Sequence, residues 1–397
     1  MKYASITKRL TGEGTGAWQI HQQGRIRQEQ GDDIISLSIG DPDFDTPDPI
    51  IERTVKSLRG GRTHYVQIAG IPALRQAIAD NHAEALNQPL TVDNVAVVPG
   101  AQNGIFVAAQ CVIEAGDEII MPDPFYTTYD YVVGATGAQK VMIPLQPEAG
   151  FRLNVDDVAA AITPRTRAIM LNTPHNPTGM VLSRDELEAI GEICQTHNLW
   201  VITDEVYSAL CYDLPHISPA SIPTIADRCI TVSGVSKSYA MTGFRLGWVI
   251  GSTQTIHYIN ELLSGMIFGT ATFVQDAALE ALTGDQTPVQ EMRQAYKRRR
   301  DLVCDAIDEI PGLTCYRPQG GVFALLNVQE TGLTANEFGQ RLLDEQGVTM
   351  IPGDGFGPTA AGYLRLSLTN PDDRLAEACQ RLANFMQELA CKKSTPI

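Results

Sequence analysis

The chain has 397 residues, of which 44% are hydrophobic and 19% are charged, and its formal net charge is −16 at pH 7. This composition is typical of a folded protein with a large core and roughly two or three structural units. The acidic balance argues against nucleic acid as a partner, because proteins that bind it carry a basic surface. No apolar run approaches the roughly 20 residues that cross a bilayer. The basic residues at the start of the sequence are not followed by an apolar segment. We therefore expect no signal peptide and a cytoplasmic location.

The eight cysteines are scattered, with no Cys-x-x-Cys pair and no histidine at metal-ligand spacing. We therefore expect reduced thiols and no metal site. The one basic cluster, residues 297–300, lies in an expected helix, where a solvated helix face is the favoured interpretation.

Residues 95–250 alternate short apolar runs with amphipathic stretches, a pattern typical of a mostly parallel sheet flanked by helices. Helices are expected between most of the strands, among them Ala101–Ile113 and Ser183–His197. The second of the two begins with a capping box formed by Ser183 and Glu186. The expected strands are Val95–Val98, Glu118–Met121, Lys140–Ile143, Ala168–Leu171, Leu199–Thr203, Cys229–Val232 and Arg245–Ile250.

The pattern changes beyond Gly269, where strands and helices mix after a long connecting helix. This order predicts a smaller α+β domain. We assign residues 46–286 to the large domain, and residues 1–45 and 287–397 to the small one. The expected elements of the second part are the helices Gln275–Leu282, Thr287–Ile310, Ala335–Glu345 and Asp372 to about Ala390, an apolar segment at Val322–Val328 and a strand at Tyr363–Leu368.

Polar residues follow the ends of several expected strands, which is where open α/β sheets bind their ligands. The turn at residues 99–102 offers a glycine and free helix N–H groups, which suit a phosphate. The loop at residues 172–179 is dense in turn signals, and Asp204 stands at a strand tip with Tyr207 three residues on. Each feature alone also fits a plain loop or a helix cap.

The segment from Ser233 to Trp248 holds Lys237 among small and hydroxyl residues, with Arg245 eight residues further. A lysine that reacts as an amine must lose its proton, and burial beside other cations favours that loss. An arginine can grip a phosphate with two parallel donors. In isolation, a solvated Lys and Arg beside a strand is an equally good interpretation.

Three motifs together are far more specific: His-Asn-Pro-Thr-Gly at 175–179, Asp-Glu-Val-Tyr at 204–207, and Ser-Lys-Ser-Tyr-Ala-Met-Thr-Gly-Phe-Arg at 236–245. In this combination and order the chain resembles, over essentially its whole length, the fold type I pyridoxal-phosphate enzymes, specifically the class I/II aminotransferases. The resemblance implies an α/β fold in which a large domain with a mostly parallel mixed sheet flanked by helices carries a smaller α+β domain. It also implies pyridoxal 5'-phosphate as cofactor and a homodimer with shared active sites.

The resemblance assigns roles position by position. Lys237 would bind the cofactor aldehyde and carry the proton, and Asp204 would pair with the pyridine nitrogen. Asn176 and Tyr207 would hydrogen-bond the ring's phenolic oxygen, and Tyr126 would stack on the ring. Ser233 and Gly234 depart from the commonest pattern before the lysine. The residues expected to hold the phosphate are Gly100, Ala101, Gln102, Ser236 and Arg245.

Four further matches concern the substrate and the dimer. Arg365 resembles the arginine that binds the substrate α-carboxylate, with Asn176 beside it, and Gly40 resembles a glycine that lines the same group. Trp18 would roof the substrate pocket. Tyr65 resembles the tyrosine that reaches the phosphate from the neighbouring subunit.

The leading hypothesis is an aminotransferase with ping-pong chemistry. Residues 16–21, 40–47 and 216–223 resemble arginine–pyruvate transaminases in particular, so arginine or another basic or neutral amino acid is the expected donor and pyruvate an expected acceptor. The alternatives are an aspartate or aromatic aminotransferase, a β-lyase of the same fold, and a non-catalytic ligand-binding protein. An aspartate preference lacks support, because no arginine in residues 261–273 can be assigned to a second carboxylate.

Overall fold

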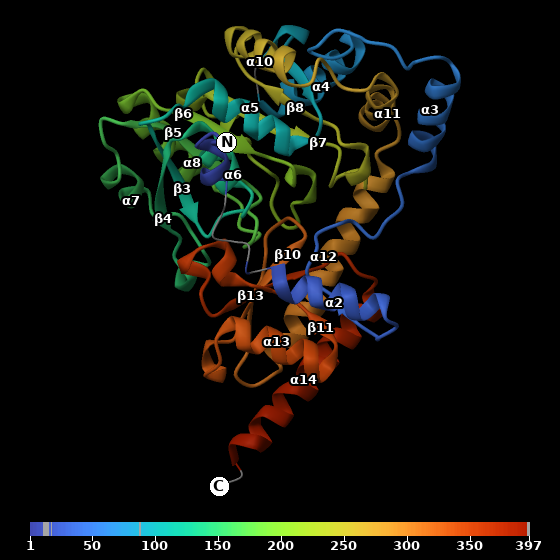
Figure 1. Cartoon of the computed structure of the whole chain (residues 1–397), viewed down its shortest axis with the longest axis vertical. Coiled ribbons are helices and arrows are strands. Elements are labelled where there is room, and N and C mark those ends of the chain that lie inside the picture. Colours follow the sequence, from blue (N-terminus) through green and yellow to red (C-terminus); the bar gives the residue numbers. More distant parts are fainter. Residues whose placement is uncertain (11–15, 17, 87–88, 395–397) are drawn as a thin grey trace.

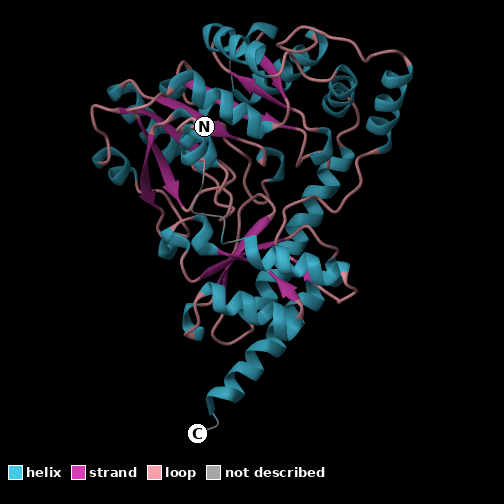
Figure 2. Cartoon of the chain, in the orientation of Figure 1, coloured by secondary structure: helices cyan, strands magenta, loops and turns pink. Residues whose placement is uncertain are grey.

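The computed structural model describes residues 1–10, 16, 18–86 and 89–394. These residues form a large unit around a seven-stranded sheet and a smaller unit around a four-stranded sheet, with the long helix α12 (Thr287–Asp308) running from one to the other (Figures 1 and 2). Ala17 and residues 11–15 lie outside the described residues. Among the described helices, none is both long and apolar enough to cross a membrane.

The large sheet is parallel except for one strand. Strand β8 is antiparallel to both of its neighbours, and the remaining pairs are all parallel. Its central strands are apolar on both faces because helices cover both sides. The strand order is β2 (Val95–Val98), β8 (Gly247–Ile250), β7 (Cys229–Gly234), β6 (Trp200–Asp204), β5 (Thr166–Asn172), β3 (Glu118–Asp123) and β4 (Gln139–Pro144).

Two separate hydrophobic cores cover the two faces of this sheet. One contains buried side chains of α5 (Ala101–Val112), α6 (Tyr129–Thr136) and α10 (Thr253–Met266). The other receives side chains of α3 (Asp48–Arg59), α4 (Pro72–Leu86), α7 (Val155–Ala160), α8 (Arg184–His197), α9 (Pro223–Ala226) and α11 (Thr272–Thr283).

The capping box predicted for α8 is confirmed: Ser183 Oγ accepts from Glu186 N, and the Glu186 carboxylate accepts from Ser183 N at 2.7 Å.

The small unit joins segments from both ends of the chain. Its antiparallel sheet has the order β12 (Ile351–Pro352), β13 (Tyr363–Ser367), β10 (Phe323–Asn327) and β9 (Thr314–Tyr316), and β1 (Ile35–Ser36) pairs in parallel with β11 (Val348–Thr349). Helices α2 (Gln19–Glu29), α13 (Ala335–Gln346) and α14 (Asp372–Ser394) pack around these strands.

Helix α1 (Ile6–Arg9) lies instead against α6 of the large unit, where Arg9 Nε donates to Gly134 O at 2.8 Å. The domain limits at residues 45 and 286 stay a prediction.

All seven expected strands of the large unit agree with the structure to within two residues at each end. Strand β8 begins at Gly247, two residues after the expected start, because Arg245 adopts a left-handed conformation with φ 51°. Arg245 Nη1 donates to Thr242 O at 2.7 Å, which closes a turn that an extended backbone could not form. The side chain of Arg245 is thereby aimed at the sheet edge, where the polar residues gather.

Candidate active site

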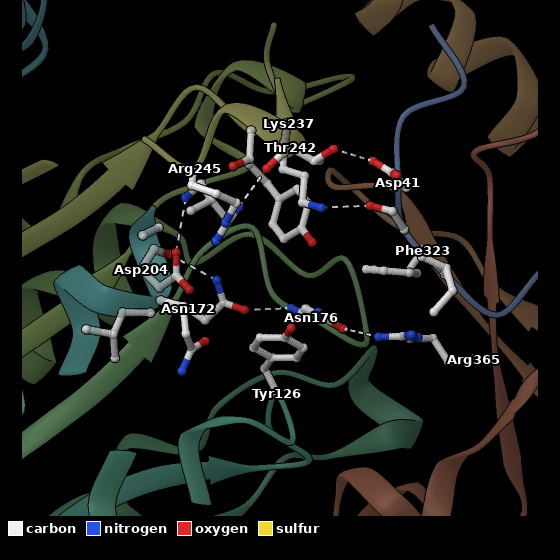
Figure 3. A pocket seen from close by; sticks show the side chains of 18 of the residues that line it. Asp41, Tyr126, Asn172, Asn176, Asp204, Lys237, Thr242, Arg245, Phe323 and Arg365 are labelled. Carbon is white, nitrogen blue, oxygen red and sulfur yellow. Dashed lines mark hydrogen bonds between the residues drawn. The ribbon is translucent and has the colours of Figure 1, made fainter. Parts of the chain in front are cut away.

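A cavity of about 330 Å³ lies between the two units, at the carboxyl ends of the parallel strands (Figure 3). The large unit supplies one wall, and the small unit together with the segment near residue 40 supplies the other. Twelve of the residues proposed from the sequence line it: Trp18, Gly40, Ala101, Gln102, Tyr126, Asn176, Asp204, Tyr207, Ser236, Lys237, Arg245 and Arg365.

Lys237 follows the end of β7, and its side chain enters the cavity. Its Nζ donates to Gly40 O at 2.7 Å. Burial lowers the pKa of the amine to about 8, and the cations of Arg365 and Arg245 act in the same direction, while Asp41 opposes them. A larger share of Lys237 is therefore in the neutral, nucleophilic form near neutral pH than an ordinary lysine would have.

Asp204 ends β6 and lines the cavity, and its side chain is buried. Tyr129 OH donates to its Oδ2 at 2.8 Å, and Val206 N donates to its Oδ1 at 3.2 Å. Burial raises the pKa of this carboxyl to about 6, against the lowering effect of the two hydrogen bonds. A carboxylate of this kind seeks a cationic N–H partner, since ionisation without one is costly.

The Tyr129 contact was missed by the sequence reasoning. The sequence shows Tyr129 only as one apolar residue in a short helix, three positions after the predicted Tyr126. The two rings meet edge to face at 5.6 Å, and Tyr129 is buried. No motif marks such a support, because it depends on α6 packing below the tip of β6.

Arg365 is the largest fully buried side chain of the described residues. It donates through Nη1 to Asn176 Oδ1 at 3.0 Å and through Nη2 to Ser38 O at 2.8 Å, and its guanidinium lies 3.9 Å from the centroid of the Phe323 ring. Burial lowers its pKa to about 10. Its Nε has no hydrogen-bond partner among the described residues. A buried guanidinium with an unmet donor suits a carboxylate ligand.

The turn from β2 to α5 is built to admit an anion. Gly100 has φ 84°, and a Cβ there would lie 2.5 Å from Arg245 Nη2. No side chain caps the first turn of α5, so its N–H groups remain available at the cavity. Gly247 permits the same approach from β8, because a Cβ on it would lie 2.6 Å from Ala101 N. This seat, with the amine of Lys237 and the carboxylate of Asp204, fits pyridoxal phosphate.

Residues 37–46 form a strap that crosses between the two units beside the cavity. The small unit holds it through Ser367 N, which donates to Leu37 O at 2.8 Å. The large unit holds it through Thr242 Oγ1, which donates to Asp41 Oδ1 at 2.7 Å. The sequence reasoning had missed several lining residues, among them Ile39, Asp41, Asn172, Thr242 and Phe323; for Asp41 the available signal was its place directly after Gly40.

Two of the proposed site residues do not line the cavity. Gly100 is absent from the cavity lining, and it contributes to the phosphate turn through its backbone. Tyr65 is 85% exposed and stacks edge to face on Phe268 at 5.4 Å.

Residues 32–382 match the family described as aminotransferase class I and II. The chain belongs to this family. The enzyme is an aminotransferase, and family membership implies pyridoxal phosphate as its cofactor. The sequence of this aminotransferase is 46% identical to that of an arginine–pyruvate transaminase of Pseudomonas aeruginosa, over 98% of this chain and 99% of that protein. It is also 34% identical to an aspartate aminotransferase of Geobacillus stearothermophilus, over 98% of this chain and 100% of that one.

Solved structures show the same fold. The aspartate aminotransferase of Thermus thermophilus with maleate superimposes with a TM-score of 0.91 at 32% identity, covering 97% of this chain and 99% of that one. The aromatic aminotransferase of Pyrococcus horikoshii gives a TM-score of 0.87 at 36% identity, covering 92% and 99%. The predicted fold type I architecture is therefore confirmed.

Proposed function

We propose that this aminotransferase moves the α-amino group of a basic or neutral amino acid, with arginine as the leading candidate, to pyruvate or a similar 2-oxo acid. The observation that carries the proposal is the convergence of a partly buried amine (Lys237), a buried carboxylate (Asp204) and a buried guanidinium (Arg365) on one cavity. The 46% identical relative described as an arginine–pyruvate transaminase supports this choice of donor and acceptor.

Five residues would hold the phosphate of the cofactor: Gly100, Ala101 and Gln102 at the start of α5, with Ser236 and Arg245. The support is the uncapped helix N-terminus and the contact that Gly100 permits with the Arg245 guanidinium.

The ring of the cofactor would be held by four residues. Asp204 would keep the pyridine nitrogen protonated, while Asn176 and Tyr207 would donate to the phenolic oxygen and Tyr126 would stack on the ring. Asn176 Oδ1 already accepts from Arg365, so its Nδ2 is the atom left to donate. When bound, pyridoxal phosphate supplies an electron sink for the pair left behind by the departing Cα proton.

Lys237 would do two jobs in turn. Its neutral Nζ would hold the cofactor at its aldehyde carbon, with release of water, and once the substrate amine has taken that place, the same Nζ would take up the proton of the substrate Cα and later give it back. Gly40 O, which accepts from Nζ at 2.7 Å, orients the amine on the side of the substrate. A pKa of about 8 suits a group that must both accept and donate a proton near neutral pH.

The substrate α-carboxylate would bind Arg365, whose unmet Nε donor points to such a ligand. Gly40 and Asn176 would flank the carboxylate. Trp18, whose ring centroid lies 6.0 Å from the guanidinium, would cover it and exclude water.

We also propose a cytoplasmic homodimer in which Tyr65 reaches the phosphate of the neighbouring subunit. Its 85% exposure leaves it free to enter another subunit. Nearby Phe268 is 56% exposed, and α10 adds Tyr258 at 52% and Met266 at 40%. Large apolar side chains exposed together are typical of a protein–protein interface. Sedimentation equilibrium tests the dimer, and a monomer at micromolar concentration would contradict it.

A panel of amino donors with pyruvate and 2-oxoglutarate tests the substrates. We expect turnover of arginine with pyruvate and formation of alanine. If basic donors are inactive while aspartate or aromatic amino acids react, the second candidate, an aspartate or aromatic aminotransferase like the relatives at about 34% identity, replaces the first.

Cysteine-type substrates distinguish a β-lyase in the same assay. Release of ammonia and pyruvate without formation of a new amino acid would show an elimination.

A further inference from the structure

We propose that Asp41 recognises the cationic side chain of the amino donor, so that the cavity selects guanidinium and ammonium donors over neutral ones of the same shape. The inference rests on the function proposed above and adds the residue that sets its specificity. Asp41 has no assigned role in cofactor or carboxylate binding.

The charged side chains of the cavity favour Asp41 as the partner of a cationic substrate. Asp204 also lines the cavity, but both of its oxygens accept hydrogen bonds from the protein. Asp41 is therefore the acidic group left for a substrate. The charged residues among the described lining are Asp41, Asp204, Lys237, Arg245 and Arg365.

One carboxylate oxygen of Asp41 is free to bind a substrate. Its Oδ1 accepts from Thr242 Oγ1 at 2.7 Å, which fixes the carboxylate, and the described residues supply no salt-bridge partner. Asp43, two residues further on, provides the contrast: Arg299 holds both of its oxygens, at 2.7 and 2.8 Å. Asp43 thus anchors the strap to α12, while the second carboxylate oxygen of Asp41, a residue of the cavity lining, has no hydrogen-bond partner among the described residues.

The position of Asp41 in the chain also suits this role. Asp41 directly follows Gly40, whose carbonyl oxygen accepts from the reactive Lys237 Nζ. A donor with its α-carboxylate on Arg365 and its α-amine at Lys237 has only its side chain left to place. Ile39 and Trp18, which line the same cavity as Asp41, offer apolar surface for the methylene carbons of such a side chain.

The discriminating experiment compares arginine with citrulline, which has nearly the same shape but no charge. We would measure kcat/KM for both donors with the full-length holoenzyme and with Asp41→Asn. Any effect of the substitution on Lys237 is common to the two donors and cancels in their ratio. We expect the arginine-to-citrulline ratio to fall about 10- to 150-fold, in keeping with the loss of one charge-assisted hydrogen bond.

Asp45→Asn is the matched control, because it removes the same charge from the same strap at a residue that does not line the cavity. It should leave the ratio within about twofold. A second measurement needs no variant: raising the salt concentration should lower kcat/KM for arginine more than for citrulline.

An unchanged ratio in Asp41→Asn, or an equal fall in Asp45→Asn, would overturn the inference while leaving the proposed function intact. Equal salt dependence of the two donors would count against it in the same way. Absence of any arginine turnover by the unaltered enzyme would instead overturn the donor assignment, and the inference with it.

Discussion

Replacement of Asp204 by Asn should make the cofactor-free protein more stable and the enzyme inactive. Burial raises the pKa of this carboxyl from 3.8 to about 6. Each pKa unit corresponds to 1.36 kcal/mol, so the ionised carboxylate destabilises the folded protein by about 3 kcal/mol at pH 8. The asparagine amide carries no charge, and it can still accept from Val206 N and contact the Tyr129 hydroxyl.

The sign follows from proton linkage. The folded protein binds this proton more tightly than the unfolded chain does. The contribution of the carboxyl to the free energy of unfolding is therefore fully present below about pH 3.8, and it is lost as the pH rises through 6. The gain from Asp204→Asn should accordingly be about 3 kcal/mol at pH 8 and about half of that at pH 5.

Urea denaturation of the cofactor-free protein at pH 8 and pH 5, followed by intrinsic fluorescence, measures the gain. Tyr129→Phe is the matched comparison, because it keeps the charge and removes its hydrogen bond, and should destabilise the protein by about 1–3 kcal/mol at pH 8. Our reasoning would be refuted if Asp204→Asn destabilised the protein at pH 8, or if its gain were equal at the two pH values.

Three further substitutions test the roles proposed for the site. Lys237→Ala should abolish the absorbance near 420 nm after addition of pyridoxal phosphate and lower the transamination rate by about 10⁴-fold or more; an activity near that of the unaltered enzyme would contradict its role. Arg365→Gln should raise KM for amino donors by about 100-fold, because a charge-assisted hydrogen bond contributes about 1.5–3 kcal/mol; a change in kcat alone would argue against carboxylate binding. Gly100→Ala should weaken cofactor affinity at least about tenfold, as a Cβ would lie 2.5 Å from Arg245 Nη2 at a φ of 84°. Gly243→Ala is its control, since a Cβ there meets no atom within 4 Å, and an equal loss in both would count against the phosphate seat.

Sequence alone determined the elements and the polar residues that follow them. Continuous apolar runs such as Val95–Val98 and Cys229–Val232 predict strands of a covered parallel sheet, because a strand buried on both faces has no polar side. Strand-end polarity then identifies Asp204 and Lys237, since the carboxyl ends of parallel strands meet at one edge. Local chemistry also fixes the start of α8, where Ser183 caps the helix within its own turn.

Only the tertiary structure decided how these residues are tuned. The pKa values of Lys237 and Asp204 depend on burial and on neighbours such as Tyr129 and Arg365, which are distant in sequence. The unmet Nε of Arg365 and the free oxygen of Asp41 also depend on the tertiary structure. Their hydrogen-bond partners are set only when the strap at residues 37–46 lies between the two units. Desolvation and charge coupling are properties of packing across the chain, and no local pattern in the sequence encodes them.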